Sequence, residues 1–487
     1  MRAIVITAPP FEFTDILDVH IQKGANRHGY ARIKGYIQEE MEEGYFKMAL
    51  SETLVAIMAE DYSGTRQALF HGILEDMDIS AENGMVVMEL LIMPYSRLLD
   101  HKPEIRVFQN PSLTYNALVD AVLAPFDDAF AIVNAGRGQA IGGMFVQYQE
   151  TAWAFLVRMA SMENDVVVPN DILGGINLLF GFPEKASSPA PLLDPVSYEA
   201  KKNVGGYIYK RDNNVLNISE NDSVLYIVKD REIRNLCDRV TFQGRLLYIS
   251  SIESVWEGQE LVHYYILTSR NGTRVPQSRN MDIIGASLDG QVSQVSGSKV
   301  KLGLPTAHEN DTGVTKWHPF STVYSSPDGT GWYAMPVAGD KLRLYFPTEV
   351  EDDGYTISAV HLNVKSASGA VSAAAPVLET DEEGEAPRTK EEKTLISNSF
   401  GKEIELTPTT IRITSGGKTI LIDDEAGIFI TSDTDIEISG TETVAVSSPN
   451  GSIVMIGEKT VTIEQENAMV ELNEENVIFK GAQVRTE

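Results

Sequence analysis

The acidic side chains best suited to acid–base chemistry stand close together, at Glu349, Glu351, Asp352 and Asp353. Two carboxylates held about 5–9 Å apart across a cleft can hydrolyse a glycosidic bond. Near-consecutive loop positions rarely reach opposite walls of a cleft, so the segment instead predicts a solvated hairpin tip. The sequence therefore offers no catalytic residue, and we expect a protein that is not an enzyme.

Motifs that would hold a metal or a cofactor are also missing from the sequence. The chain has no His-Glu-x-x-His, Cys-x-x-Cys, Gly-x-Ser-x-Gly or P-loop motif. Its 8 histidines are scattered, without the spacing of three metal ligands. The segment from Gly136 to Gly142 has glycines but lacks the spacing of a nucleotide-binding loop, and it predicts a flexible turn. We expect neither a cofactor nor a metal site.

Length and charge limit the classes of protein that remain. A chain of 487 residues is too long for one core and predicts about three domains. The formal net charge of -29 argues against nucleic-acid binding, because Lys and Arg would have to neutralise phosphates. It also disfavours electrostatic docking on anionic lipid. The charge fits a soluble component of a large assembly.

The N-terminus and the cysteine content predict synthesis in a reducing compartment. The single cysteine, Cys237, excludes an intrachain disulfide framework. The N-terminal apolar run soon meets Pro9, Pro10 and Glu12, which is not the pattern of a signal peptide. No uninterrupted run of about eighteen apolar residues could span a bilayer. We expect assembly in the bacterial cytoplasm and release by a route other than a signal peptide.

Residues 398–487 repeat an apolar pair at positions i and i+2, with successive pairs starting 7 to 9 residues apart. Such pairs lie on one face of an extended strand, and turn formers such as Gly416-Gly417 separate them. The residues predicted to form the core of this repeat are Ile404, Leu406, Ile411, Ile413, Ile420, Ile422, Ile428, Ile430, Ile436, Ile438, Val444, Val446, Val461 and Ile463. The pattern continues in Ile453/Met455, Val470/Leu472 and Val477/Phe479.

A short fixed period is typical of stacked, solenoid-like architecture. Each repeat offers only two inward apolar side chains, so one chain wound alone could not enclose a dry core, and its strand edges would stay unpaired. Three chains wound together could enclose one, because each supplies a wall and each strand pairs with a strand of a neighbouring chain. We predict an intertwined triple-stranded β-helix over residues 398–487, with a β-sandwich or a single-chain β-solenoid as the alternative.

The rest of the chain is predicted to be mainly β with helical insertions. Alternating apolar residues predict strands at 30–37, 45–50, 67–73, 85–93, 224–228, 240–252 and 262–268. Helical spacing predicts helices at 110–125 and 151–163.

Residues 285–365 have the size and strand pattern of a small Greek-key barrel of the OB type. Their clearest strands are predicted at 291–302 and 340–346, and loops at 308–313 and 327–331. Residues 366–397 are rich in Ala, Ser, Gly and acidic residues, so they cannot bury enough apolar surface to fold and are predicted to be a linker.

Two motifs resemble segments of one protein family. Residues 145–160, FVQYQETAWAFLVRMA, resemble a segment of VgrG proteins and phage late-control (tail hub) proteins. Residues 332–347, WYAMPVAGDKLRLYFP, followed by residues 357–361, resemble the OB-fold segment of the same proteins. With the linker and the repeat behind them, these motifs extend the resemblance over essentially the whole chain. The chain resembles the hub–spike protein of a contractile injection system.

The resemblance implies a different structural role for each region of the chain. Residues 1–284 would form a tail-hub region whose duplicated β-domains give a trimer pseudo-sixfold symmetry, residues 285–365 an OB-fold neck, and residues 398–487 the needle. The partners implied are two further copies of the chain, a hexameric inner-tube protein, baseplate proteins and the target cell envelope, with no nucleic acid. No histidine follows His361, so a separate tip protein of the PAAR type is expected instead of a metal-bound apex.

The type of particle stays open among a phage tail, a bacteriocin, an extracellular injection system and a type VI system. The chain carries neither a lysozyme domain before the needle nor an effector after it, which favours a bacteriocin or an extracellular injection particle. The alternatives are a peptidoglycan-degrading phage tail protein and a receptor-binding fibre, and the fibre would need a globular adhesive tip.

Overall fold

The computed structural model of the chain describes residues 5–61, 64–82, 84–184, 191–304, 316–322, 324–325, 331–358, 394–397, 401–473 and 475–483. The chain divides into two compact units, Met1–Ile396 and Ser397–Glu487. The described residues are mainly β and form several sheets, so the predicted fold class is confirmed. The predicted linker lies outside the described residues except for 394–397, as do the predicted loop 308–313 and most of 327–331.

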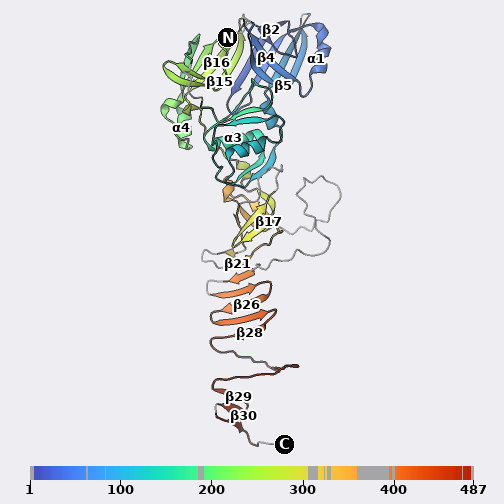
Figure 1. Cartoon of the computed structure of the whole chain (residues 1–487), viewed down its shortest axis with the longest axis vertical. Coiled ribbons are helices and arrows are strands. Elements are labelled where there is room, and N and C mark those ends of the chain that lie inside the picture. The colour runs from blue at the N-terminus through green and yellow to red at the C-terminus, as the bar shows by residue number, and fades with distance from the viewer. Residues whose placement is uncertain are drawn as a thin grey trace. The chain divides into compact units, whose positions relative to one another are not determined.

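The first unit begins with a large sheet (Figure 1). Between the first and the second group of its strands, the chain forms an α/β insertion. Its strands are β1 (Val5–Thr7), β2 (Asp15–Gly24), β3 (Tyr30–Ile37), β4 (Leu54–Glu60), β5 (Arg66–Glu82), β6 (Met85–Met93), β12 (Ser197–Lys202), β13 (Val224–Asp230), β14 (Arg239–Phe242), β15 (Arg245–Glu257) and β16 (Glu260–Thr268). They lie in the order β1-β4-β5-β6-β3-β2-β15-β16-β13-β12, and β14 also pairs with β15.

The large sheet contains one arrangement of five strands twice. Strands β2 to β6, the first module, lie in the order β4-β5-β6-β3-β2, and strands β12 to β16, the second module, lie in the order β14-β15-β16-β13-β12. Corresponding strands also follow one another in the same order along the chain, and all these pairs are antiparallel. The described strands thus contain the duplication that the family resemblance implied.

The two modules also match in register and in packing. In the first, β5 has a bulge against β6 between Leu74 and Asp76; in the second, β15 has one against β16 between Ile249 and Ser251. When the strand registers of the two modules are aligned at these bulges, buried core positions correspond. Leu90 of the first core corresponds to Tyr265 of the second, and both side chains are buried.

The insertion between the modules has a core of its own. Its elements are β7 (Glu104–Phe108), α2 (Tyr115–Leu123), β8 (Phe130–Val133), β9 (Phe145–Glu150), α3 (Ala152–Met162), β10 (Val167–Pro169) and β11 (Asn177–Phe180). Both helices were predicted, and each begins after a threonine, Thr114 or Thr151, whose side chain accepts a hydrogen bond from the first turn. Their apolar faces pack into the insertion core around Phe155 and Leu118.

Two local predictions in the modules were wrong. Residues 45–50 do not form a strand, because α1 (Glu42–Met48) occupies most of them, with two acidic residues in its first turn and Tyr45 buried against Phe11. Residues 240–252 do not form one strand, because Gln243 and Gly244 adopt positive φ and fold them into the β14–β15 hairpin. Helix α4 (Val204–Asp212), between β12 and β13, was not predicted.

A five-stranded antiparallel sheet follows the second module. Its strands are β17 (Ser287–Ser296), β18 (Lys299–Gly303), β19 (His318–Pro319), β22 (Lys341–Tyr345) and β23 (Tyr355–Ser358), in the order β19-β18-β17-β22-β23. A parallel bridge from Phe320 to Thr356 joins its two edges. The edges meet at this bridge and not along a full ladder, which fits a partly open barrel of the predicted OB type. Elsewhere in this unit β20 (Tyr324–Ser325), β21 (Gly331–Ala334) and β24 (Thr394–Ser397) pair in that order.

The second unit consists of two small antiparallel meanders. Strands β25 (Lys402–Leu406), β26 (Thr410–Ser415), β27 (Lys418–Asp423) and β28 (Gly427–Thr431) form the first, and β29 (Thr460–Gln465), β30 (Ala468–Asn473) and β31 (Val477–Lys480) form the second. The described residues between them, 432–459, form no strand.

Candidate functional site

The apolar pairs of the repeat form columns on one face of the first meander. Cross-strand partners align Ile404, Ile413, Ile420 and Ile430 in one column and Leu406, Ile411, Ile422 and Ile428 in the other. The strand period of two and the hairpin register place these side chains on a common face. The second meander repeats the arrangement, with Val461 opposite Leu472 and Ile463 opposite Val470.

This apolar face is not covered within one chain. Ile413 is 42% exposed and Ile428 is 68% exposed. None of the described hydrophobic residues of the second unit is buried, because both meanders are single layers. An exposed apolar patch of this kind marks an interaction surface.

The structure corrects one part of the prediction for the spike. We expected each strand to pair with a strand of a neighbouring chain, but β25 to β28 pair with one another, as do β29 to β31. The two-residue turns at Gly416-Gly417 and at Glu466-Asn467 favour such local hairpins. Ile436, Ile438, Val444 and Val446, which were predicted core residues, lie in residues 432–459, outside any strand, and are exposed by half or more.

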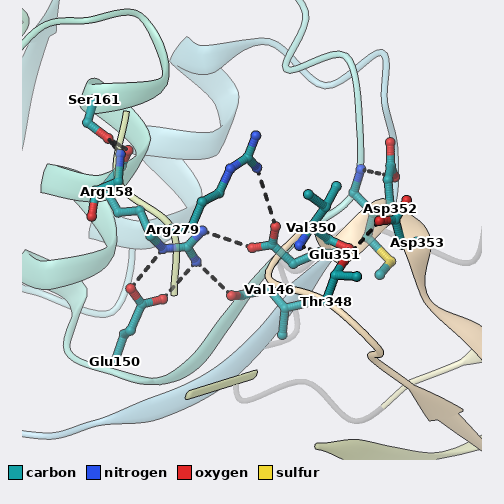
Figure 2. Close-up of polar contacts among 12 residues, drawn as sticks. Val146, Glu150, Arg158, Ser161, Arg279, Thr348, Val350, Glu351, Asp352 and Asp353 are labelled. Atoms are coloured by element: carbon teal, nitrogen blue, oxygen red, sulfur yellow. Dashed lines mark hydrogen bonds and ion pairs between the residues drawn. The ribbon is translucent and has the colours of Figure 1, made fainter. Parts of the chain in front are cut away.

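A second candidate site lies inside the first unit, where Arg158 of α3 is buried among carboxylates (Figure 2). Its Nε and Nη2 donate to the two carboxylate oxygens of Glu150 over 2.8 and 2.7 Å. Nη2 also donates to the backbone oxygen of Val146, and Nη1 donates to Glu351 Oε1, each over 2.8 Å. Burial by itself lowers the pKa of Arg158, but the carboxylates of Glu150 and Glu351 raise it above the usual value. The guanidinium is therefore held charged.

Glu351 was predicted to lie at a solvated hairpin tip, and that prediction was wrong. Its side chain is 1% exposed, and Arg279 Nη1 lies 3.9 Å from its second carboxylate oxygen. Asp352, the next residue, accepts a hydrogen bond from the backbone N–H of Met144 over 2.9 Å and pairs with Lys316. The short 3-10 helix Glu351–Asp353 therefore points Glu351 and Asp352 at the insertion, which no local sequence signal indicates.

This buried ionic joint, which we define as Glu150, Arg158, Arg279 and Glu351, is accompanied by a shared hydrophobic core. Strands β7 and β9 of the insertion contribute Val107 and Val146, and the five-stranded sheet contributes Leu302 and Phe346. Across the same boundary, Gln109 Nε2 donates to the backbone oxygen of Leu302 over 3.0 Å. The insertion and the five-stranded sheet therefore form one packed body, so force on one can pass directly to the other.

The glycine-rich segment from Gly136 to Gly142 forms turns next to α2. Gly136 has φ of +59°, and a Cβ at this position would lie 2.3 Å from Cδ2 of Tyr115. Gly138 donates its backbone N–H to Asn116 Oδ1 over 2.9 Å. The glycines are thus explained by backbone conformation and close packing, as the predicted turn requires.

The described residues contain no group of three or more His, Cys, Asp or Glu side chains placed to hold a metal ion. Nor is any helix among them long and apolar enough to cross a membrane. Two of the described histidines are buried: His263 in the second module, beside Ser254 Oγ, and His318 in the five-stranded sheet. Burial lowers the pKa of each to about 4, so both are neutral at pH 7.

Comparison with known proteins agrees with the resemblance found in the motifs. Residues 48–166 match the family model for the phage tail baseplate hub (GPD). The match spans β4 to β6 of the first module and most of the insertion, including both Glu150 and Arg158. No curated protein matches the chain by sequence.

Solved structures with similar folds come from secretion systems and phage tails. The Escherichia coli c3393 protein is a type VI secretion component described as structurally similar to the T4 tail proteins gp27 and gp5. It is 12% identical, with a TM-score of 0.52 over 72% of this chain and 99% of its own. The 43 kDa tail protein of prophage MuSo2 from Shewanella oneidensis is 14% identical, with a TM-score of 0.42 over 57% of this chain and 100% of its own. A chain of the Francisella PdpA–VgrG complex is 11% identical, with a TM-score of 0.44 over 85% of this chain and 83% of its own.

The family match and the fold together make the chain similar to gp27-like and VgrG-like hub proteins. Such proteins are structural components of phage tails and type VI-like particles.

Proposed function

We propose that this chain forms a homotrimeric hub and cell-envelope-puncturing spike at the distal end of a contractile injection particle, and that it has no enzymatic activity. Residues 1–284 act as the hub, 285–365 as the neck, 366–397 as a linker and 398–487 as the spike. Sheath contraction supplies the work, and the protein transmits it along its axis.

The observation that carries this proposal is the uncovered apolar face of the second unit. Full burial of an Ile or Leu side chain contributes about 1.5–3 kcal/mol relative to exposure. Three copies that face one another would bury the columns of Ile404 and Leu406 in a common core, with each meander as one wall. The predicted core residues from Ile404 to Ile463 are assigned to this core.

Residues 432–459 support the intertwining of three chains over a limited stretch. They make no ladder pair in the chain, yet they keep the apolar pairs Ile436/Ile438 and Val444/Val446. Buried backbone N–H and C=O groups must find partners, and the same stretch of neighbouring chains would supply them. Strand exchange between chains is thus proposed for this stretch alone, between two meanders that each stay within one chain.

The duplicated modules support docking onto a sixfold tube. Each chain presents two modules of identical strand order, so a trimer presents six similar modules. A ring of six similar modules can match the six subunits of a hexameric inner-tube protein. A ring of only three domains could not match the six subunits one to one. The buried ionic joint supports the mechanical part of the proposal, since it fixes the insertion to the neck sheet.

The remaining partners follow from the same proposal. Baseplate proteins would surround the hub, a separate PAAR-like tip protein would cap the spike, and the target cell envelope would be met on firing. We place the chain in a bacteriocin or extracellular injection particle, assembled in the bacterial cytoplasm and released with it. The alternative is a peptidoglycan-degrading phage tail protein. The acidic residues Glu351 and Asp352 are engaged in ion pairs and give this alternative no support.

Native mass spectrometry of the purified full chain tests the proposal. We expect a trimer, and we expect electron microscopy to place it at one end of tubes formed by the inner-tube protein of the same gene cluster. A monomer, or a trimer that never associates with tube ends, would contradict the proposal. A cell-wall zymogram tests the alternative, since a clearing band would establish hydrolysis and overturn the non-enzymatic assignment.

A further inference from the structure

An exposed apolar surface lies on and beside helix α1 of the first module. Tyr45 is the only residue of this helix that is buried, and its ring packs against Phe11. Five large apolar side chains in and next to the helix are exposed, and we define them as the α1 patch: Met41, Phe46, Met48, Leu50 and Leu54. In Figure 1 α1 lies on the side of the first module that faces away from the second module, which therefore does not cover it. An exposed apolar cluster of this kind marks an interaction surface.

The backbone after α1 is ordered, yet it presents Leu50 to solvent. Thr53 Oγ1 donates to the backbone oxygen of Met48 over 2.7 Å and accepts from the N–H of Leu50 over 2.8 Å. The N–H of Thr53 donates to the backbone oxygen of Leu50 over 3.0 Å. This turn leaves the Leu50 side chain 68% exposed, so it contributes little to the stability of the chain. An apolar side chain fixed in this way can bind a partner at a low entropic cost.

A comparison of the two modules shows that their strand arrangement does not require α1. In the first module residues 38–53, which contain α1, connect β3 to β4. The corresponding connection in the second module, residues 231–238, joins β13 to β14, is shorter and contains no helix. Its apolar residues Ile233 and Leu236 are half-buried and pack against the hydrophobic cores. Helix α1 and its exposed apolar side chains are therefore an addition to the first module alone.

The charges around the α1 patch select the chemistry of its partner. The connection 38–53 carries five glutamates and one lysine, namely Glu39, Glu40, Glu42, Glu43, Glu52 and Lys47. The lysine is engaged within the helix, where its Nζ lies 2.6 Å from Glu43 Oε1. Such an acidic border repels the phosphates of nucleic acids and of anionic lipids. It also disfavours a symmetric contact between two α1 patches, because like charges would meet.

We propose that the α1 patch is the docking site for a baseplate protein whose contact surface has an apolar centre bordered by Lys and Arg. The apolar side chains provide most of the affinity, and the glutamates orient the partner and speed its association. The inference rests on the proposed trimer for its stoichiometry. Only the first module of each chain carries the patch, so a trimer binds three copies of this partner. The proposed contact with a sixfold tube uses what the two modules share, whereas this contact uses the helix that distinguishes them.

Titration of the purified full chain with each purified baseplate protein of the same gene cluster tests the proposal. Native mass spectrometry should show one of these proteins bound in three copies per trimer. Combining Phe46→Ser with Leu50→Ser should weaken this binding by roughly tenfold to hundredfold, measured by isothermal titration calorimetry. Both side chains are exposed in the free chain, so the variant should remain folded and trimeric. The matched control is Met281→Ser, at an apolar side chain that is 62% exposed outside the α1 patch, and it should bind as the parent does.

Charge reversal tests the acidic border separately. Glu40→Lys should weaken binding by roughly threefold to tenfold at low salt, and the difference from the parent should shrink at high salt. The control is Asp127→Lys, at an exposed acid of the insertion, and it should have no effect. Equal effects of Glu40→Lys and Asp127→Lys would show that the net charge of the chain, and not the α1 patch, attracts the partner.

Four outcomes would overturn the docking site. In the first, the combined Phe46→Ser and Leu50→Ser variant binds every baseplate protein as the parent does. In the second, a partner sensitive to this variant binds in six copies per trimer. In the third, the variant loses the trimer itself, which would show that a second copy of the chain covers the patch. In the fourth, the parent binds vesicles that contain phosphatidylserine and the variant does not, which would assign the patch to a membrane.

The proposed function fails by a different result. A parent chain that is monomeric in native mass spectra would contradict the trimeric hub and spike. The docking site would still be decided in that case, since a monomer should bind one copy of the baseplate protein and lose it in the combined Phe46→Ser and Leu50→Ser variant.

Discussion

Arg158 Nη1 lies 2.8 Å from Glu351 Oε1 and joins residues that stand 193 positions apart in the chain. The contact connects α3 of the insertion to the loop that follows β22 of the five-stranded sheet. Both side chains are almost fully buried, at 3% and 1% exposure, and Glu150 supplies the second carboxylate. Because two acids share one guanidinium, the arginine is required to keep both of them in the interior.

Replacing Arg158 with Met should lower the free energy of unfolding of the first unit by about 3–5 kcal/mol. The substitution leaves Glu150 without its cation and leaves the buried Glu351 with Arg279 alone, 3.9 Å away. Chemical denaturation followed by tryptophan fluorescence measures the change. Arg211→Met is the matched control, because Arg211 pairs with Asp212 at the surface, where water and salt screen the pair and it contributes little to stability. Equal effects of the two variants would argue against the buried ionic joint as a structural element.

An aspartate in place of Ile413 should destabilise the trimer and leave the hub folded. Ile413 is 42% exposed in one chain, so the substitution costs little there. In the trimer it would bury three unpaired charges, at a cost of several kcal/mol. Differential scanning calorimetry should show the loss of the spike transition. Thr414→Asp adds the same charge at the neighbouring position on the opposite face and should leave that transition in place; equal melting of the two variants would contradict the apolar core.

Acidification should destabilise the first unit through His263 and His318. Each has a folded-state pKa of about 4, below the ordinary value of 6.5, because burial disfavours the imidazolium. The unfolded chain therefore binds protons first, so stability is complete above about pH 6.5 and falls as pH drops towards 4. The loss is on the order of 3 kcal/mol for each histidine.

Denaturation midpoints measured from pH 7.5 to pH 4 test this dependence. In His263→Gln, which cannot be protonated in this range, the slope between pH 6.5 and 4 should become shallower. His101→Gln, at an exposed position, serves as the control. An unchanged slope in His263→Gln would rule out this histidine as a source of the pH dependence.

Gly136→Ala should destabilise the insertion by about 1–3 kcal/mol, because the added Cβ would need both a left-handed backbone and space that the Tyr115 ring occupies. Gly138→Ala separates the two causes, since Gly138 also has positive φ, at +71°, but faces open space. Thermal denaturation should place Gly138→Ala between the parent and Gly136→Ala. The reverse order would show that contact with Tyr115 is not what requires a glycine.

Local sequence patterns were sufficient where short-range physics decides the structure. The helices at residues 151–163 and 110–125 were predicted because their apolar residues recur at helical spacing. The two-residue period at Ile411 and Ile413 predicted strands with one apolar face, and the meander has that face. The sequence also determined that this face is too thin to enclose a core in one chain.

Only the tertiary structure decided which strands pair and which charges meet. The hairpins of β25 to β28 replaced the expected exchange between chains, because a two-residue turn closes a local ladder at a low entropic cost. The duplication of the modules is a matter of strand order and register, which many sequences can satisfy. The ion pair of Arg158 with Glu351 joins segments that are distant in the sequence. The local sequence of an acidic loop does not differ between a loop in solvent and a loop at a buried boundary, so it could not predict this ion pair.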